Sequence, residues 1–172
     1  MNEIKREKTI VKGNPLDNKK ILVVDDEADV LESLLDLLPM CRLKTARTFE
    51  HARDLIETEQ FDIAILDIMG VNGYELLNLA GKKGIVVVML TANALSVDDT
   101  VKSFKQGAAS YIPKEKMIDI EIFLQDVLEA HRKGKGFMDR WLGRFNSYYE
   151  KKFGSDWKEG DKEFWEKHGY WL

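Results

Sequence analysis

Residues 21–38 of the chain read ILVVDDEADVLESLLDLL. The first four residues are apolar at consecutive positions and rich in β-branched side chains, as is typical of a parallel strand covered on both faces. That run ends abruptly in three acids, Asp25, Asp26 and Glu27. From Val30 onward, apolar residues recur at helical spacing. The stretch therefore predicts a buried strand, a turn rich in carboxylates, and an amphipathic helix.

The same alternation continues along the chain. Two more apolar runs, IAIL at 63–66 and IVVVML at 85–90, have the pattern of buried strands. Two weaker strand candidates are RLKTA at 42–46 and ASYI at 109–112. Segments with helical spacing of apolar residues lie between and after these strands, near 52–56, 74–79, 97–104 and 120–128. A strand followed by a helix is thus expected five times.

Five such units between residues 20 and 131 predict an α/β fold. Alternation at this spacing implies a doubly wound, five-stranded parallel sheet, (βα)5, with right-handed crossovers. Five strands are too few for an eight-stranded barrel. An open sheet of this kind gathers its ligand-binding groups at the carboxyl ends of its strands. The residues that follow each strand are therefore the first candidates for a functional site.

Charged and polar residues stand at four of these strand ends. Asp25 and Asp26 follow the first strand, and Asp67 follows the third. Thr91 ends the fourth strand, and Lys114 follows the fifth. Carboxylates that crowd together repel one another, and a hard cation such as Mg²⁺ relieves that repulsion. A lysine and a hydroxyl beside the cation suit phosphoryl oxygens, and an aspartate there can act as a nucleophile. The sequence has no G-x-x-x-x-G-K-[ST] loop, so a nucleotide is not the obvious phosphoryl donor.

Four short motifs at these positions resemble the receiver domain of bacterial two-component response regulators. They are VVDDE at 23–27, ILDIM at 65–69, LTA at 90–92 and YIPK at 111–114. The resemblance covers residues 20–131, about two thirds of the chain. It implies a flavodoxin-like sheet with strand order 2-1-3-4-5 and a role in phosphorelay signalling.

The resemblance also implies a phosphoacceptor and a metal site. Asp67 would accept phosphate from the phosphohistidine of a sensor histidine kinase or a phosphotransfer protein. Asp26 would bind Mg²⁺ directly and Asp25 mainly through water. The Asp67 carboxylate and the Met69 backbone carbonyl would be further ligands. Mg²⁺ is the expected cofactor.

Three other residues match the family pattern. Thr91 and Lys114 would hold the phosphoryl oxygens beside Asp67. Tyr111 matches the switch aromatic, whose ring would move inward as Thr91 is drawn toward the phosphate. Phosphorylation would then change association, and a homodimer is possible through the fourth helix, fifth strand and fifth helix, or through the C-terminal extension. By the same resemblance the chain is a switch that catalyses only its own phosphorylation and dephosphorylation, and is not a metabolic enzyme.

Two features depart from the family pattern. The distance from Asp67 to Gly73 is six positions, which is shorter than usual, and the proline expected between them is absent. Pro113 precedes Lys114 and Glu115 follows it, whereas the family commonly has proline after the lysine. The short loop leaves open a receiver-like interaction module that is not phosphorylated. A Mg²⁺-dependent phosphatase with an aspartyl nucleophile shares the chemistry, but its usual second acid shortly after the nucleophile is absent.

Residues 132–172 resemble no known output domain, and their composition sets them apart. All four Trp lie beyond position 140. Aromatic residues at steps of four, four and three predict one helix, and a second set suggests a shorter helix after Gly160-Asp161. The two sets are Phe137, Trp141, Phe145 and Tyr148, and then Trp157, Phe164 and Trp165.

Three interpretations of this extension are open. Helix-spaced aromatic residues usually pack, so the favoured one is a helical hairpin docked on its own receiver or on a dimer mate. Alternatively, aromatic residues are exposed anchors for a partner protein, since such residues concentrate at binding hot spots. The candidate anchors are Trp141, Phe145, Trp157 and Trp165. Nucleic-acid binding is the third choice, because residues 131–172 hold ten Lys/Arg against seven Asp/Glu, a net charge of only +3.

The expected organisation has three parts, a flexible N-terminal segment (1–19), a receiver domain (20–131) and an aromatic helical extension (132–172). The N-terminal residues lack the apolar centre of a secretory signal, and no apolar run approaches the length of a membrane span. Cys41 is the only cysteine, so no intramolecular disulfide can form, which is compatible with a reducing compartment. The sequence thus predicts a cytoplasmic protein that does not enter a membrane.

Overall fold

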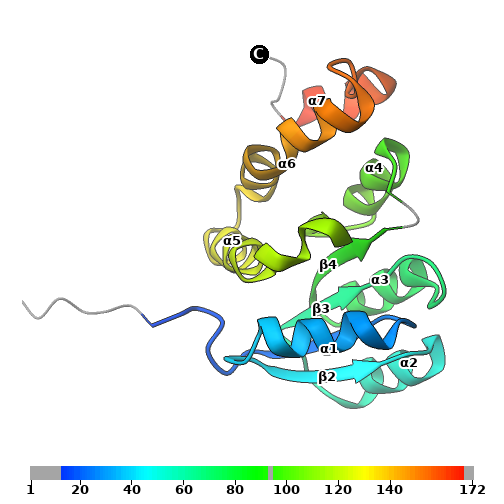
Figure 1. The fold of residues 1–172 in the computed structure, drawn as a ribbon, viewed down its shortest axis with the longest axis vertical. Coiled ribbons are helices and arrows are strands. Elements are labelled where there is room, and N and C mark those ends of the chain that lie inside the picture. The colour runs from blue at the N-terminus through cyan, green and yellow to red at the C-terminus, as the bar shows by residue number, and fades with distance from the viewer. Residues whose placement is uncertain (1–12, 93–94, 169–172) are drawn as a thin grey trace, which may run out of the picture.

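A computed structural model describes residues 13–92 and 95–168 of the chain. Its centre is a five-stranded parallel sheet in the order β2-β1-β3-β4-β5 (Figure 1). The strands are β1 (Lys20–Val24), β2 (Arg42–Ala46), β3 (Ile63–Leu66), β4 (Val86–Thr91) and β5 (Ser110–Pro113). The predicted doubly wound α/β fold with strand order 2-1-3-4-5 is confirmed.

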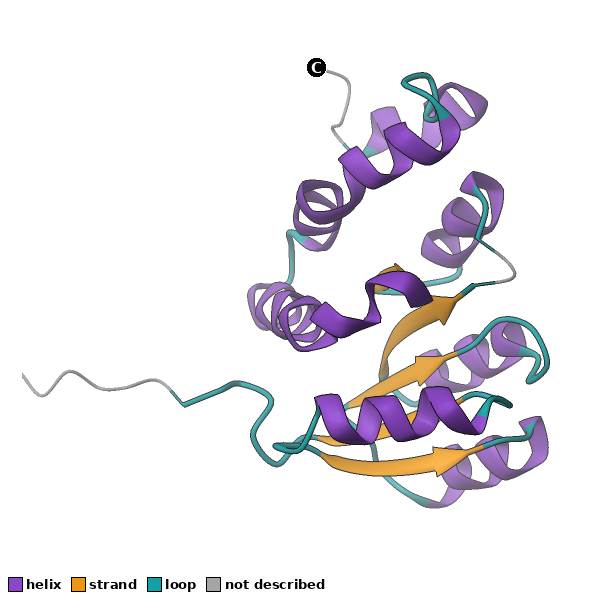
Figure 2. Cartoon of the chain, viewed as in Figure 1, coloured by secondary structure: helices purple, strands orange, loops and turns teal. Residues whose placement is uncertain are grey.

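Helices cover both faces of the sheet (Figure 2). Residues of α1 and α5 share one hydrophobic cluster with the sheet, and residues of α2 and α3 share a second cluster on the opposite face. The helices of this part are α1 (Ala28–Leu37), α2 (Phe49–Thr58), α3 (Gly73–Lys82), α4 (Val97–Lys105) and α5 (Ile120–Lys133), with a 3-10 turn, η1 (Lys114–Asp119), before α5. Among the described residues, no helix is long and apolar enough to cross a membrane.

The two edge strands of the sheet differ in burial. Along β2, exposed and half-buried side chains alternate, and only Ala46 is buried. All four residues of β5 are buried, although it is also an edge strand. β5 is buried because α6 (Phe137–Phe153) lies against it. The segment RLKTA gave a weak strand signal because β2 is an edge strand exposed to solvent. β5 is also an edge strand, but α6 covers it.

Residues 13–19 pack on the sheet domain, so the predicted flexible N-terminal segment is wrong for these positions. The Leu16 side chain is fully buried, and its carbonyl accepts a hydrogen bond from the Cys41 thiol. The Asn14 amide donates to the Glu121 carboxylate at 2.8 Å, which joins the segment to α5. A single leucine in a polar stretch has no periodicity, so the sequence pattern could not reveal this contact. Residues 1–12 of the predicted segment lie outside the described residues.

The C-terminal extension forms a helical hairpin on its own receiver. α6 is followed by a short 3-10 turn, η2 (Glu159–Asp161), and by α7 (Lys162–Lys167). The extension's buried aromatic side chains belong to the same hydrophobic cluster as the sheet and α5. Figure 1 shows α6 and α7 beside α4 and α5, at the β5 edge of the sheet. The favoured interpretation, a hairpin docked on its own receiver, is confirmed for residues 137–168.

Two expectations about the extension are wrong in detail, and one is confirmed. The proposed partner anchors Trp141, Phe145, Trp157 and Trp165 are at most 5% exposed, so with the extension docked they form a core and are not exposed anchors. Tyr149 is fully buried while Tyr148 is half-buried, because the packed face of α6 keeps Trp141 and Phe145 of the predicted stripe but has Tyr149 in place of Tyr148. The second short helix is confirmed where it was predicted, after Gly160-Asp161, because α7 begins at Lys162 with the Asp161 side chain accepting a hydrogen bond from the Phe164 amide. Trp157 lies before this helix.

The surface predicted for a homodimer is also occupied. α6 contacts β5 and α5, and aromatic side chains of the extension contact Phe104 on α4. We call this contact region, in which residues 137–167 cover α4, β5 and α5, the aromatic seam. With the extension in this position, much of the α4–β5–α5 face is already covered within one chain, and a homodimer stays a prediction.

Candidate functional site

The predicted site residues of the receiver meet at the carboxyl edge of the sheet. β1 pairs with β3 so that Val24 is opposite Leu66, and Asp25 and Asp67 follow these two residues. The Asp67 amide donates to the Val24 carbonyl at 2.9 Å, which continues the ladder by one residue. The pairing therefore places the two carboxylates on neighbouring strand ends, as the sequence predicted.

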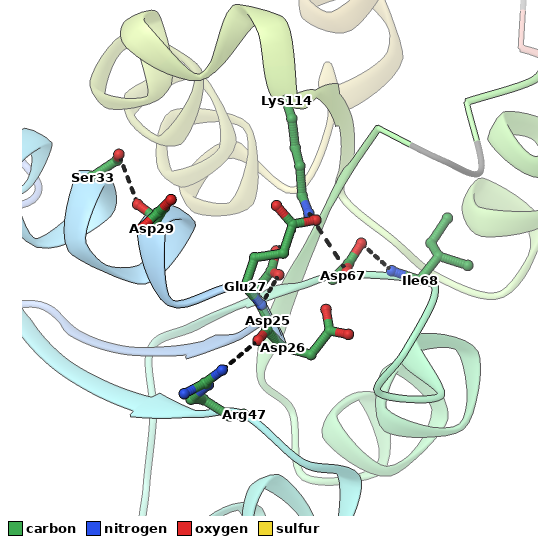
Figure 3. A network of polar contacts seen from close by, with 9 residues as sticks. All are labelled: Asp25, Asp26, Glu27, Asp29, Ser33, Arg47, Asp67, Ile68 and Lys114. Atoms are coloured by element: carbon green, nitrogen blue, oxygen red, sulfur yellow. Dashed lines mark hydrogen bonds and ion pairs between the residues drawn. The ribbon is translucent and has the colours of Figure 1, made fainter.

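Lys114 connects the acids of this edge. It opens η1 directly after β5, and its ammonium is 2.8 Å from the Asp25 carboxylate and 3.5 Å from the Asp67 carboxylate. The same ammonium is 3.4 Å from the Glu27 carboxylate. Figure 3 shows Lys114 reaching down toward Asp25, Glu27 and Asp67. One ammonium and three carboxylates, from three strand ends, therefore form one cluster.

Glu27 is a member of this cluster that was not among the predicted site residues. Its backbone amide donates to the Asp25 carboxylate at 2.9 Å, which holds the turn after β1. The signal for it was present, because Glu27 is the third acid of the DDE run that ends the first strand. It was passed over because the matching family motif assigns metal binding to the two aspartates alone.

The two buried acids resist ionisation. Burial raises the pKa of the Asp67 carboxyl to about 6, and the nearby charge of Asp25 adds to the rise, against the opposing charge of Lys114. Burial likewise raises the pKa of Asp25, although Lys114 bonds to it. Burial disfavours the charge of Lys114, but its hydrogen bond and ion pairs with the acids raise its pKa above the usual value. The site thus holds an excess of negative charge that one ammonium does not balance.

The donor set fits a hard divalent cation. One carboxylate oxygen each from Asp25, Asp26 and Glu27 lies within 4.8 Å of the others, with Asp25 buried and the other two exposed. Oxygen-only ligands of this kind suit Mg²⁺ and not the softer metals. The elevated pKa of Asp67 and Asp25 agrees with this assignment, because a bound cation would stabilise their charged forms. The role of the Met69 carbonyl stays a prediction, and the Met69 side chain is exposed.

The short loop after Asp67 depends on two glycines. Gly70 has a φ of +82°, and a Cβ there would lie 2.5 Å from an Asp26 carboxylate oxygen. A Cβ on Gly73 would lie 2.0 Å from the Asp67 carbonyl oxygen. The loop therefore brings its backbone against the acidic cluster more closely than any other residue type would permit.

Thr91 and Tyr111 are both fully buried. Thr91 ends β4, on the strand beside β3, and is paired with Pro113 of β5. The Tyr111 ring belongs to the hydrophobic cluster with α2 and α3, and burial raises the pKa of its hydroxyl. The ring is thus already inward. Phosphoryl contact by Thr91 and a switch role for Tyr111 stay predictions.

The candidate anchors of the extension take no part in the acidic cluster. Trp141, Phe145, Trp157 and Trp165 lie in the aromatic seam, at the side of the receiver and not at its carboxyl edge. The molecule therefore has two separate groups of candidate residues, one charged and one aromatic, and β5 belongs to both.

Comparison with known sequences identifies one part of the chain. The sequence model of the family described as "Response regulator receiver domain" matches residues 21–123. The heme response regulator HssR of Staphylococcus aureus (strain bovine RF122 / ET3-1) is 37% identical over 99 residues, covering 54% of this chain and 43% of HssR. The chain thus spans less than half the length of the curated relatives it matches.

Solved structures agree with this assignment. A CheY-like response regulator receiver domain protein from Methanospirillum hungatei JF-1 is 31% identical with a TM-score of 0.60, covering 67% of this chain and 98% of that one. The BeF3-activated DrrB receiver domain is 29% identical with a TM-score of 0.58, covering 65% and 98%. α6 and α7 lie beyond the last residue of the family match.

Proposed function

Because the chain belongs to the response regulator receiver family of two-component systems, we propose that it accepts a phosphoryl group on Asp67. One observation supports this most directly. The Asp67 carboxylate, the Lys114 ammonium and the acids that follow β1 converge at one edge of the sheet. The Lys114 ammonium is 2.8 Å from the Asp25 carboxylate and 3.5 Å from the Asp67 carboxylate, so the closer ion pair is with Asp25 and the Asp67 oxygen is less occupied.

In the proposed reaction, a carboxylate oxygen of Asp67 attacks the phosphorus of a phosphohistidine on a histidine kinase or phosphotransfer protein. The new oxygen–phosphorus bond forms as the phosphorus–nitrogen bond breaks, and the departing imidazole takes up a proton. Lys114 supplies a positive charge 3.5 Å from the reacting carboxylate, and Thr91 supplies a hydroxyl from the neighbouring strand end. Mg²⁺ held by Asp25, Asp26 and Asp67 would neutralise charge on the phosphoryl oxygens.

Ionisation of Asp67 sets a lower pH limit on this reaction. Only the carboxylate form has the electron pair that attacks phosphorus. With a pKa of about 6, Asp67 is mostly ionised at pH 7 and mostly protonated at pH 5. Without a cation, the reactive form should therefore decline below about pH 6. A bound Mg²⁺ would stabilise the Asp67 carboxylate, so with Mg²⁺ the decline should come at a lower pH.

The product would be a switch and not a metabolic catalyst. The acyl phosphate adds negative charge at the carboxyl edge, and its formation and hydrolysis are the only reactions we assign to the chain. The chain must be in the same compartment as the protein that donates the phosphoryl group. We therefore propose that it acts in the cytoplasm, with the catalytic part of a sensor kinase.

The proposal is tested by incubating the purified chain with acetyl phosphate and Mg²⁺ and measuring intact mass. We expect the mass gain of one phosphoryl group on the wild type and none on Asp67→Asn. Asp54→Asn is a matched control, because Asp54 lies on α2 with a 65% exposed side chain, and it should gain mass as the wild type does. No gain on the wild type, or an equal gain on Asp67→Asn, would reject the proposal.

The tight loop after Asp67 favours one alternative. Its backbone leaves little room beside Asp26, so a receiver-like module that binds partners without phosphorylation is the second candidate. That alternative predicts no mass gain in the same experiment. A nucleic-acid-binding extension predicts salt-dependent retention on DNA, and the burial of the extension's aromatic residues leaves it without support.

A further inference from the structure

Helix α6 contacts all three elements of the face that it covers. The Trp141 indole donates a hydrogen bond to the Tyr111 carbonyl of β5 at 2.8 Å. The same indole stands edge-on to Phe104 of α4, with ring centroids 5.1 Å apart. Phe145 meets Phe123 of α5 at 4.8 Å between centroids. One helix therefore joins α4, β5 and α5 through aromatic contacts of defined geometry.

Polar groups fix the position of α6 on this face. The Tyr149 and Thr100 hydroxyls are 2.6 Å apart and both buried. The Thr100 hydroxyl donates to the Ser96 carbonyl, which leaves it to accept from Tyr149, so the buried Tyr149 hydroxyl depends on Thr100. The Arg144 guanidinium bonds to both carboxylate oxygens of Asp126 on α5, at 2.8 and 3.3 Å. These polar pairs form only when α6 lies in one position on α4 and α5. The extension therefore behaves as a ligand with a specific binding site on the receiver.

One of these contacts is next to the acidic cluster in sequence. Glu115 follows Lys114 directly, and its carboxylate accepts a hydrogen bond from the Tyr148 hydroxyl of α6. The Lys152 ammonium is 3.8 Å from the same carboxylate. Lys114 meanwhile bonds to Asp25. Of two adjacent residues of η1, Lys114 thus contacts the acidic cluster and Glu115 contacts the extension. The family commonly has proline at the position of Glu115, and a proline side chain could not accept the hydrogen bond from Tyr148.

We propose that residues 137–167 are an intramolecular ligand of the α4–β5–α5 face, and that a phosphoryl group on Asp67 weakens their docking through the Lys114–Glu115 pair. This inference rests on the proposed function. The added negative charge would compete with Asp25 for Lys114 and draw the start of η1 toward the site. Glu115 would then move away from Tyr148, because a shift of the η1 backbone toward the acidic cluster carries Glu115 with Lys114 while Tyr148 stays on α6.

The coupling must act in both directions. If a phosphoryl group weakens docking, then docking weakens acceptance of the phosphoryl group by the same factor at equilibrium. A factor of about ten is expected, within the range usual for coupled sites. The α4–β5–α5 face, including Phe104 and Phe123, is then about ten times more available to another protein in the loaded state than in the unloaded state. The extension therefore makes exposure of this face conditional on the signal.

Tryptophan fluorescence of the full chain can test this, because all four Trp lie in the extension and report on it alone. The chain is loaded with acetyl phosphate and Mg²⁺, intact mass is measured on the same sample, and quenching by acrylamide is compared with an unloaded sample. We expect the quenching constant to rise severalfold on loading. A sample that gains mass without a change in quenching overturns the coupling alone. A sample that gains no mass overturns the proposed function, and the coupling with it.

Two variants separate the proposed route from a general loosening. Tyr148→Phe keeps the ring and removes only the hydrogen bond to Glu115. Arg144→Gln removes a bond between α6 and α5 that does not involve η1. We expect Tyr148→Phe to lose most of the loading-dependent change in quenching, and to reach a larger loaded fraction than the wild type at limiting acetyl phosphate. Arg144→Gln should keep the change. An equal response in both variants would overturn the route through Glu115.

Discussion

β5 connects two regions of opposite character. Beyond its carboxyl end, Lys114 stands among three acids, two of which are buried and resist ionisation. Along its side, Trp141 and Phe145 of α6 pack against apolar residues of α4 and α5. The first region holds like charges close together, which opposes folding. The second removes large aromatic surfaces from water, which favours it.

The difference shows how stability and reactivity are divided in this chain. Asp67 must keep an unbalanced charge in a partly buried place in order to react, so its surroundings cannot be optimised for stability. The aromatic seam has no such requirement within the described structure, and its buried side chains can pack closely. We therefore expect substitutions in the seam to reduce the free energy of unfolding, and a substitution at Asp67 to raise it.

The largest expected effect is that of Trp141→Ala. Trp141 is 3% exposed and its indole bonds to the Tyr111 carbonyl, so the change leaves a cavity and a buried carbonyl without its donor. We expect the free energy of unfolding to fall by about 3–5 kcal/mol. Urea unfolding followed by far-UV circular dichroism measures it without relying on the lost tryptophan. Ile118→Ala, at a 76% exposed position, is the control and should change stability by less than about 0.5 kcal/mol.

The next effect should have the opposite sign and depend on pH. The folded-state pKa of Asp67, about 6, is above its ordinary value of 3.8, so the folded chain binds this proton more tightly than the unfolded chain. Stability from this group is fully present below about pH 4 and is lost as pH rises through about 6. Asp67→Asn removes the charge, so it should exceed the wild type in stability by up to about 3 kcal/mol at pH 8.

Two further measurements make this prediction strict. The advantage of Asp67→Asn should disappear near pH 4, where the folded wild-type carboxyl is neutral. Saturating Mg²⁺ at pH 8 should also reduce the advantage, because a cation that binds only the folded wild type stabilises it. A variant less stable than the wild type at pH 8 would show that the Lys114 ion pair outweighs the burial of charge.

The smallest effect concerns the turn between α5 and α6, which leads the chain into the aromatic seam. Gly136 precedes α6 with a φ of +91°, and a Cβ at this position would meet no atom within 4 Å, so Gly136→Ala strains only the backbone. We expect it to lower the free energy of unfolding by about 1–2 kcal/mol. Gly143→Ala adds the same methyl group inside α6, where it has equal space and an ordinary φ, and should raise stability by up to about 1 kcal/mol. Equal effects from both changes would mean that docking does not need this tight turn.

The carboxyl-edge residues were predictable because their signal is local. Each of Asp25, Asp67 and Lys114 directly follows an apolar strand, and parallel strands end at one edge whatever the rest of the chain does. Glu27 also lies in the run of acids that follows the first strand, but it was not predicted because the resemblance gives a metal-binding role in that run only to Asp25 and Asp26. The contacts of Leu16 had none, because one apolar residue in a polar stretch shows no period.

The aromatic seam was predictable only in part. Spacing along residues 137–148 indicated a helix and an aromatic face. It could not distinguish Tyr148 from Tyr149 as the buried residue, because neighbouring positions on a helix differ by only about 100° and the partner surface selects between them. Nor could it show that Glu115, placed where proline is common, meets Tyr148.

By itself, then, the sequence determined the five strands, their order through resemblance to a family, and the charged residues at their ends. These features depend on periodicity and on the direction of parallel strands, which are properties of short segments. Only the tertiary structure decided that the extension covers its own α4–β5–α5 face and contacts the residue after Lys114. Such contacts depend on which surfaces fit one another across many residues of chain, and no local pattern contains that information.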